Sequence, residues 1–253
     1  MNPPKLTPEL AEIIGIHVGD GYLRYAGSRK ELDISGSCEE KDYYDDHVVP
    51  LLNSCFNLSI KGRFFESRNT YGFRTSNPRV IETMKSFGFP SGKKSTIISI
   101  PPKVICFRDM KVVCSFLRGY FDTDGCFTFD KKVTNVSLFQ KSYNYYPRIM
   151  FTTCSKNLND DLIKIFTILR LKCRSYTYKP IKPTESLKYK LQITGKEAIE
   201  QWMTLIGSKN PTKVSRYLIW RKFGFCPPKT TYQQRLDILK GKLDPHLLYG
   251  PMV

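Results

Sequence analysis

Leu10 to Gly21 reads LAEIIGIHVGDG, and Ser115 to Gly125 reads SFLRGYFDTDG. Both stretches fit Gly-x-x-x-x-Asp-Gly, through Gly15 and Asp20 in the first and Gly119 and Asp124 in the second. At the glycine and aspartate content of this chain, chance supplies about 0.05 matches to such a pattern. Each stretch is an apolar, helix-like segment that ends in a carboxylate followed by glycine. The repeat predicts two related halves and pairs Asp20 with Asp124.

The same order of elements follows each motif. Alternation and turn signals predict strands at 22–25, 31–35, 60–66 and 71–75 in the first half, and at 126–130, 148–153, 174–179 and 188–194 in the second. Helices are predicted at 41–56 and 79–87, and again at 158–169 and 196–206. We therefore expect an α+β fold of two pseudo-symmetric αββαββα halves, each with a four-stranded antiparallel sheet that forms part of a DNA-binding saddle.

The boundary between the halves is predicted in the loop at 92–103, where Pro101 and Pro102 disfavour a helix. Residues 1–100 then form the first half. Residues 101–253 form the second, with a C-terminal extension that has no counterpart in the first.

Charge indicates the class of partner. The chain of 253 residues has 40 Lys and Arg against 23 Asp and Glu, a net charge of +17, which favours a polyanion. No apolar run approaches the roughly 18 residues of a membrane-spanning helix, so no membrane partner is expected. The N-terminus lacks a signal-peptide core, which predicts a cytoplasmic protein or one inside an organelle. Three histidines and no Cys-x-x-Cys spacing disfavour a zinc or histidine-metal nuclease. Nucleic acid is the expected ligand.

The predicted strands carry a basic face. Lys188, Lys190 and Gln192 alternate with apolar residues, as do Lys61 and Arg63 in the first half. An eight-residue strand covers about 26 Å, or about eight base pairs. Two such sheets end to end would follow some 16 base pairs of the major groove, which admits a β-ribbon.

The paired carboxylates indicate a hydrolytic site. An anion is disfavoured at a helix C-terminus, so a cationic group is expected near Asp20 and Asp124, with Gly21 and Gly125 suited to the turn that ends each helix. Small residues four apart (Gly15 and Gly19, Gly119 and Thr123) would let the two helices pack closely. The carboxylates would then raise each other's pKa unless a divalent cation lies between them. Oxygen ligands with few histidines favour Mg²⁺, which can hydrolyse a phosphodiester.

These segments resemble the dodecapeptide motif of LAGLIDADG homing endonucleases. LRGYFDTDG at 117–125 fits closely, whereas IIGIHVGDG at 13–21 has His17 and Val18 in place of more typical residues. The chain looks like the single-chain, two-motif form, and its tail resembles archaeal intron-encoded members. The resemblance implies a monomeric, site-specific endonuclease that hydrolyses double-stranded DNA at a long asymmetric target during intron homing.

The resemblance also implies roles for single residues. Asp20 and Asp124 would bind the catalytic metal, Mg²⁺, with Mn²⁺ or Ca²⁺ able to bind the same sites, and Gly19 and Thr123 would add backbone carbonyls. Lys94 and Lys209 match the basic residue after the last helix of each half. Asp122 is expected to be structural. Thr153 would orient solvent, a helper that Gly36 cannot replace in the first half. The residues expected to face DNA are Tyr22, Arg24, Lys61, Arg63, Arg74, Thr128, Asp130, Arg148, Lys188, Lys190 and Gln192.

Other functions stay open at this point. The same fold could serve as an intron RNA maturase or as a nucleic-acid-binding protein that does not cleave. A nuclease of the Asp…Glu-x-Lys type, with Asp33, Glu39 and Lys41, leaves the duplication unexplained. A free-standing intein is not expected, because Met1 is no splicing nucleophile and residues 250–253 contain no His-Asn pair.

Overall fold

The computed structural model describes residues 5–106, 109–131, 143–180, 182 and 184–249, and it contains two antiparallel sheets of the same topology. The first has the order β1-β2-β4-β3, formed by Gly21–Arg24, Glu31–Ser37, Thr70–Thr75 and Arg63–Phe65. The second has the order β5-β6-β8-β7, formed by Cys126–Asp130, Tyr146–Thr153, Lys188–Thr194 and Cys173–Tyr178. The predicted α+β class and the four strands per sheet are confirmed.

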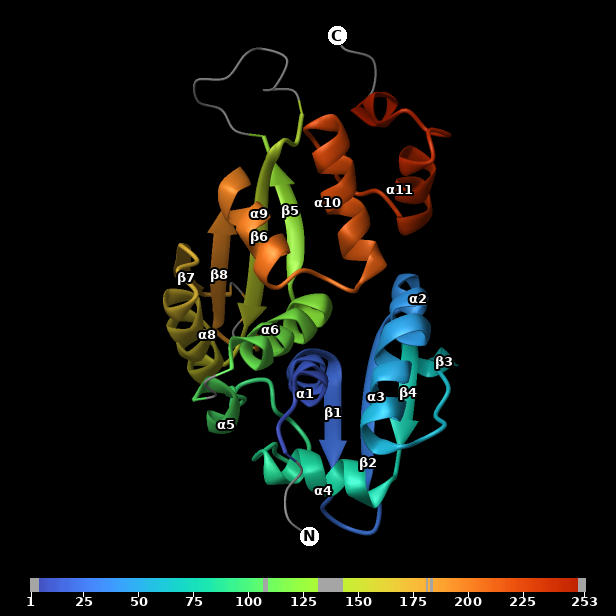
Figure 1. The fold of residues 1–253 in the computed structure, drawn as a ribbon, viewed down its shortest axis with the longest axis vertical. Helices are drawn as coiled ribbons and strands as arrows, with labels where there is room; N and C mark the ends of the chain where they lie inside the picture. The colour runs from blue at the N-terminus through green and yellow to red at the C-terminus, as the bar shows by residue number, and fades with distance from the viewer. Residues whose placement is uncertain (1–4, 107–108, 132–142, 181, 183, 250–253) are drawn as a thin grey trace.

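Two helices lie between the sheets at the centre of the molecule (Figure 1). They are α1 (Pro8–Asp20) and α6 (Met110–Asp124), and each leads directly into the first strand of its sheet. Thr7 and Asp109 begin them, because each side chain accepts a hydrogen bond from a backbone N–H of the first turn.

The remaining helices follow the predicted order. The first half has α4 (Pro78–Ser86) and a helical run of α2 (Lys41–Tyr43), a π-helical turn (Tyr44–Val48) and α3 (Val49–Phe56). The second half has α8 (Lys156–Ile168) and α9 (Lys196–Leu205), which pack against its sheet. The extension forms α10 (Pro211–Phe223), α11 (Tyr232–Leu239) and a short 3₁₀ turn (Pro245–Tyr249), beside the second sheet (Figure 1).

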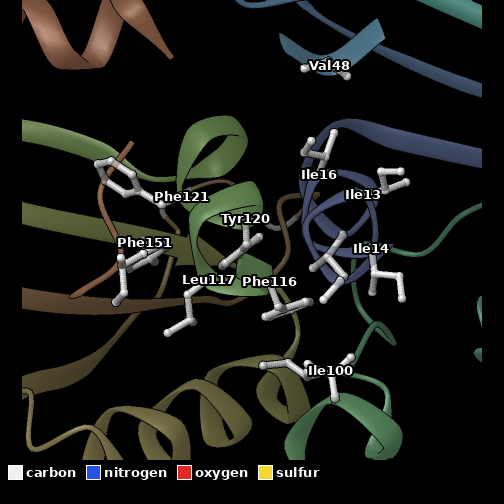
Figure 2. Close-up of a cluster of buried hydrophobic side chains, with 14 of the residues drawn as sticks. Ile13, Ile14, Ile16, Val48, Ile100, Phe116, Leu117, Tyr120, Phe121 and Phe151 are labelled. Carbon is white, nitrogen blue, oxygen red and sulfur yellow. The ribbon is translucent and has the colours of Figure 1, made fainter. Parts of the chain in front are cut away.

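Glycine determines how closely α1 and α6 approach. A Cβ atom built on Gly15 would lie 2.1 Å from the carbonyl oxygen of Phe116, and one on Gly119 would lie 2.2 Å from that of Glu12. No side chain fits at either position, so the backbones are in direct contact. Around this contact, Figure 2 shows Ile13, Ile14 and Ile16 of α1 with Phe116, Leu117, Tyr120 and Phe121 of α6, all of them buried.

A buried ion pair also joins the two helices. Glu12 of α1 accepts from Arg118 of α6 at 2.5 Å, and its other oxygen is 2.6 Å from Nε2 of His47. Hydrogen bonds from these two partners hold the pKa of Glu12 below 4.5, against the effect of burial.

The structure corrects three local predictions. Gly21 and Gly125 do not adopt a left-handed turn, since both are extended with φ of −81° and −78°. Glycine is required there because a Cβ atom would lie 2.0 Å from the His17 ring or 2.3 Å from the Phe121 ring. The strand predicted at 60–66 begins only at Arg63, so Lys61 precedes it. A one-turn helix, α5 (Pro102–Ile105), begins at Pro102, because the first position of a helix tolerates proline.

Two further predictions concern regions outside these elements. Met1 and residues 250–253, quoted against protein splicing, lie outside the described residues. Among the helices that the structure describes, none has the length and apolar character needed to cross a membrane.

Candidate active site

Asp20 and Asp124, the last residues of α1 and α6, come together where the two helices converge. A Cβ atom built on Gly19 would lie 2.1 Å from Oγ1 of Thr123 and 3.4 Å from Cγ of Asp124. Burial, with the charges of Asp124 and Glu40, raises the pKa of Asp20 to about 7. Burial also raises the pKa of Asp124, although nearby lysines oppose it. The helix ends therefore bring two carboxylates close together, where the charge of each disfavours ionisation of the other.

A buried lysine binds the carbonyl groups at the end of each helix. Nζ of Lys94 donates to the carbonyls of residues 17, 18 and 19 at 2.8, 2.5 and 2.8 Å. Nζ of Lys213 donates to those of residues 121, 123 and 125 at 2.7, 2.8 and 2.5 Å. These contacts add donors to carbonyls at and just beyond the helix ends and counter the negative end of each helix dipole. Burial lowers the pKa of Lys94 to about 8, while Asp124 and Asp20 act in the opposite direction.

Lys213, and not the predicted Lys209, corresponds to Lys94. The Lys209 side chain is exposed, and its backbone N–H donates to Asp122 at 2.7 Å. Lys209 also follows the last helix of its half, but the two halves share the distance from that helix to the lysine. Lys94 lies eight residues beyond Ser86, the end of α4, and Lys213 lies eight beyond Leu205, the end of α9.

Asp122 anchors the loop that leads to Lys213. Its carboxylate accepts from the Ser208 hydroxyl and the Lys209 N–H, and Nδ2 of Asn210 donates to its carbonyl at 2.8 Å. Burial raises the pKa of Asp122 to about 6, although these donors oppose the shift. In the first half Val18 stands at this position, and the loop before Lys94 is attached instead to β1, through Gly92 N–H and the Leu23 carbonyl at 2.8 Å.

Asp20 has polar neighbours that sequence analysis missed. The Tyr44 hydroxyl, from the π-helical turn, donates to Oδ2 of Asp20 at 2.9 Å. Glu40 is also close, because a Cβ atom on Gly36 would lie 2.8 Å from Oδ2 of Asp20 and 2.8 Å from Oε2 of Glu40. Nδ2 of Asn210 bridges to Oε1 of Glu40 at 2.6 Å. Sequence offers little signal for these contacts, since they join separate elements.

Two cavities of about 340 Å³ adjoin the site, one for each lysine. One is lined by Lys94 and Asp124 together with Tyr22 and Thr153, so the predicted solvent-orienting threonine lies on its wall. The other is lined by Lys213 and Glu40, together with Ser37, Thr128, Arg216 and Arg235. Both cavities lie between elements of the two halves.

Tyr22, Arg74 and Thr128 lie on the sheet faces that point away from the core, because their neighbours along each strand are buried. Lys61 is exposed but lies before β3. The alternative triad is not assembled: Asp33 binds Arg68 and Arg74, and Lys41 binds Asp45. The sequence analysis did not predict that Arg68 joins Arg74 beside Asp33 on the outer face of the first sheet.

Residues 111–207 match the model of the LAGLIDADG-like domain. The second half of the chain therefore contains a LAGLIDADG-like domain. The match covers α6, the second sheet and its two helices, and the first half repeats the same order of elements and strands. LAGLIDADG proteins are homing endonucleases and maturases, and the family binds DNA.

Three relatives contain a segment similar to this chain. A probable translation initiation factor IF-2 of Methanocaldococcus jannaschii is 29% identical over 64% of the chain. The tRNA-splicing ligases RtcB of Pyrococcus furiosus and Methanopyrus kandleri are 24% and 23% identical over 83% and 78% of it. The chain matches only 13%, 22% and 20% of the length of these three relatives.

Asp20 and Asp124 fit a divalent cation by their chemistry. Two carboxylates with raised pKa supply hard oxygen donors, and Mg²⁺ is commonly held by one or two carboxylates with water and substrate phosphates. Within the described parts of the chain, no group of three or more His, Cys, Asp and Glu side chains is placed to hold a metal. The carbonyls of Gly19 and Thr123 each accept from a lysine at 2.8 Å, so a cation would share these oxygens with an ammonium group. The donor set suits a cation that completes its coordination from water and phosphate.

Proposed function

We propose that the chain is a Mg²⁺-dependent endonuclease that cuts both strands of double-stranded DNA at a long asymmetric site. One observation carries the proposal: two carboxylates end two helices in backbone contact, a lysine binds each helix end, and a sheet lies on either side. A single carboxylate at this position could simply end a helix before a turn. Two carboxylates that face each other raise each other's pKa unless a cation lies between them.

Each group of the chain has a part in this chemistry. Asp20 and Asp124 would hold the cation, which when bound polarises the scissile phosphate and activates water. Lys94 and Lys213 each donate to three carbonyls, so we assign them the role of fixed positive charge and not of proton carrier. Their charge counters the helix ends and the charge that develops on phosphate. Thr153 borders the Asp124 cavity, where its hydroxyl could orient water.

The comparisons support a unit that acts independently of its surroundings. Segments similar to this chain occur in a probable translation initiation factor and in two tRNA-splicing ligases, and make up at most 22% of each. A segment shared by such proteins contributes something other than either activity. An element that enters genes by cutting DNA has that distribution.

A cleavage selection tests the proposal. Random double-stranded DNA flanked by fixed ends is incubated with the protein and Mg²⁺, and cut products are captured and sequenced. We expect one enriched sequence of about 16 base pairs or more, cut by the wild type and bound but not cut by Asp20→Asn/Asp124→Asn. Sedimentation of the complex would show whether one copy suffices, as proposed. Continued cutting by the double variant would refute the assigned site.

The maturase alternative is an outcome of the same experiment. Gel shifts compare selected DNA with structured RNA of equal length, in Ca²⁺ to allow binding without cutting. A preference for RNA, with no DNA sequence enriched, would replace the endonuclease proposal by RNA binding.

A further inference from the structure

Three arginines surround one aromatic ring on the outer face of the first sheet. The guanidinium carbons of Arg63, Arg68 and Arg74 lie 4.9, 4.5 and 5.5 Å from the centre of the Phe65 ring. Cations at this distance are attracted to the ring face. The ring therefore gathers three cationic groups at one place on the sheet.

A buried carboxylate fixes two of these arginines. Asp33 is only 2% exposed, and Arg74 donates to its Oδ2 through both Nε (3.0 Å) and Nη2 (2.8 Å). Arg68 donates to the same carboxylate through Nη2, at 3.2 and 3.0 Å. Charge-assisted, forked contacts of this kind set the direction of a guanidinium as well as its position.

Accounting for donors leaves free N–H groups on both side chains. A guanidinium has five N–H groups. Asp33 accepts from Nε and from one N–H of Nη2 of Arg74. Nη1 and the other N–H of Nη2 then form a second pair of parallel donors at the tip of the guanidinium. The Arg74 and Arg68 side chains remain 29% and 41% exposed, so solvent or a ligand reaches these tips.

Acidic neighbours make phosphate the less suitable ligand. Asp33 and Glu31 lie beside the arginines, and Nε of Arg74 is 3.4 Å from Glu31. The carboxylates cancel much of the charge that would attract a phosphate, but they leave the hydrogen-bond geometry of the tips intact. The edge of a guanine base, with acceptors O6 and N7 in the major groove, matches an arginine fork.

The second half has different groups at the same ladder positions. Tyr22, Asp33 and Arg74 are paired across the first sheet, and Cys126, Met150 and Gln192 are paired across the second. Gln192 accepts from the Tyr176 hydroxyl at 3.2 Å, which leaves its amide N–H₂ free to donate. Glutamine pairs with adenine at N6 and N7.

We propose that Arg68 and Arg74, oriented by Asp33, form a guanine-reading site, so that the half-site bound by the first sheet contains neighbouring G·C pairs. The inference rests on the proposed function, and it specifies which bases that function selects. Asp33 is a positioning residue in this site, and the two arginine tips touch the bases.

Selection by binding tests the site without cleavage. Random duplexes are bound in Ca²⁺, recovered by gel shift and sequenced, for the wild type and for Arg68→Lys, Arg74→Lys and Asp33→Asn. We expect two nearby guanines in one half-site for the wild type. Each lysine variant keeps its charge but loses the fork, and should lose about tenfold or more of the discrimination at one guanine. Gln192→Ala is the matched control, which should change preference only in the other half-site.

Asp33→Asn separates positioning from charge. It removes a negative charge, so affinity for all duplexes should stay equal or rise, while preference for both guanines falls. Thermal melts confirm that each variant is folded. Unchanged guanine preference in the lysine variants, or uniform loss of affinity across all sequences, would overturn the guanine site and leave the endonuclease proposal standing. Failure of the wild type to enrich any duplex would instead overturn the endonuclease proposal.

Discussion

Replacing Gly119 by alanine should separate α1 from α6. The new Cβ atom would lie 2.2 Å from the carbonyl oxygen of Glu12 and 3.0 Å from the backbone nitrogen of Ile16. Both neighbours are backbone atoms, so no side-chain rotation relieves the overlap, and the helices must move apart by about 1 Å to reach ordinary contact. Overpacking of this kind costs about 3 kcal/mol. Alanine regains about 1 kcal/mol through its higher helix propensity.

The net expectation is a loss of about 2 kcal/mol in the free energy of unfolding, or about 4 to 8 °C in Tm for a chain of this size. Urea denaturation and thermal melts followed by circular dichroism measure it. Gly19→Ala is the control, because its Cβ would meet the Thr123 side chain, at 2.1 Å from Oγ1. Adding Thr123→Gly should restore part of the stability lost by Gly19→Ala, but none of that lost by Gly119→Ala. A Gly119→Ala variant as stable as the wild type would refute the backbone contact.

Three further predictions concern the site and its supports. Lys213→Met should lower the cleavage rate by about a hundredfold or more, whereas Lys209→Met, whose backbone N–H still binds its partner, should stay within a few-fold in the same assay. Tyr44→Phe removes the hydrogen-bond donor to Asp20 and should slow cleavage of one DNA strand by about tenfold. Denaturing gels would then show a transient nicked product, and equal slowing of cleavage on both strands would argue against this prediction. Glu12→Gln should have a lower free energy of unfolding than the wild type above pH 4.5. The difference should shrink as the pH falls through the lowered pKa of Glu12. Urea titrations from pH 3 to 7 check this, and a pH-independent difference between the two proteins would contradict it.

The duplicated motif predicted the helix pair, and hairpin signals predicted four antiparallel strands in each half. Gly15 and Gly119 sit where close helix packing explains them, whereas the pairing of β2 with β4 and of β6 with β8 was not predicted. The motif did not predict why Gly21 is glycine, because the reason is the His17 ring and not the backbone angle. Local pattern carries periodicity and turns, but it carries no information on which side chain occupies a given space.

Long-range contacts explain the remaining errors. Lys213 reaches the end of α6 because Asp122 fixes the preceding loop, and that carboxylate lies 87 residues before the loop N–H it binds. Tyr44 reaches Asp20 from a π-helical turn, whose extra residue changes the direction of side chains in a way that a regular helical pattern does not anticipate. Asp33 suggested a catalytic acid from sequence alone, and only the strand register shows that it lies between arginines.

The same contacts make the two ends of the site chemically different. Asp20 receives a hydrogen bond from Tyr44 and faces the charge of Glu40, and its pKa is raised to about 7. Asp124 borders a cavity with Lys94 and the Thr153 side chain, where the first half has Gly36. One end thus has an extra acid and a phenol, and the other has a threonine hydroxyl. Two phosphodiesters that react at these ends meet different fields, so the two strands should be cut at different rates even though the helices that carry the carboxylates are related by a repeat.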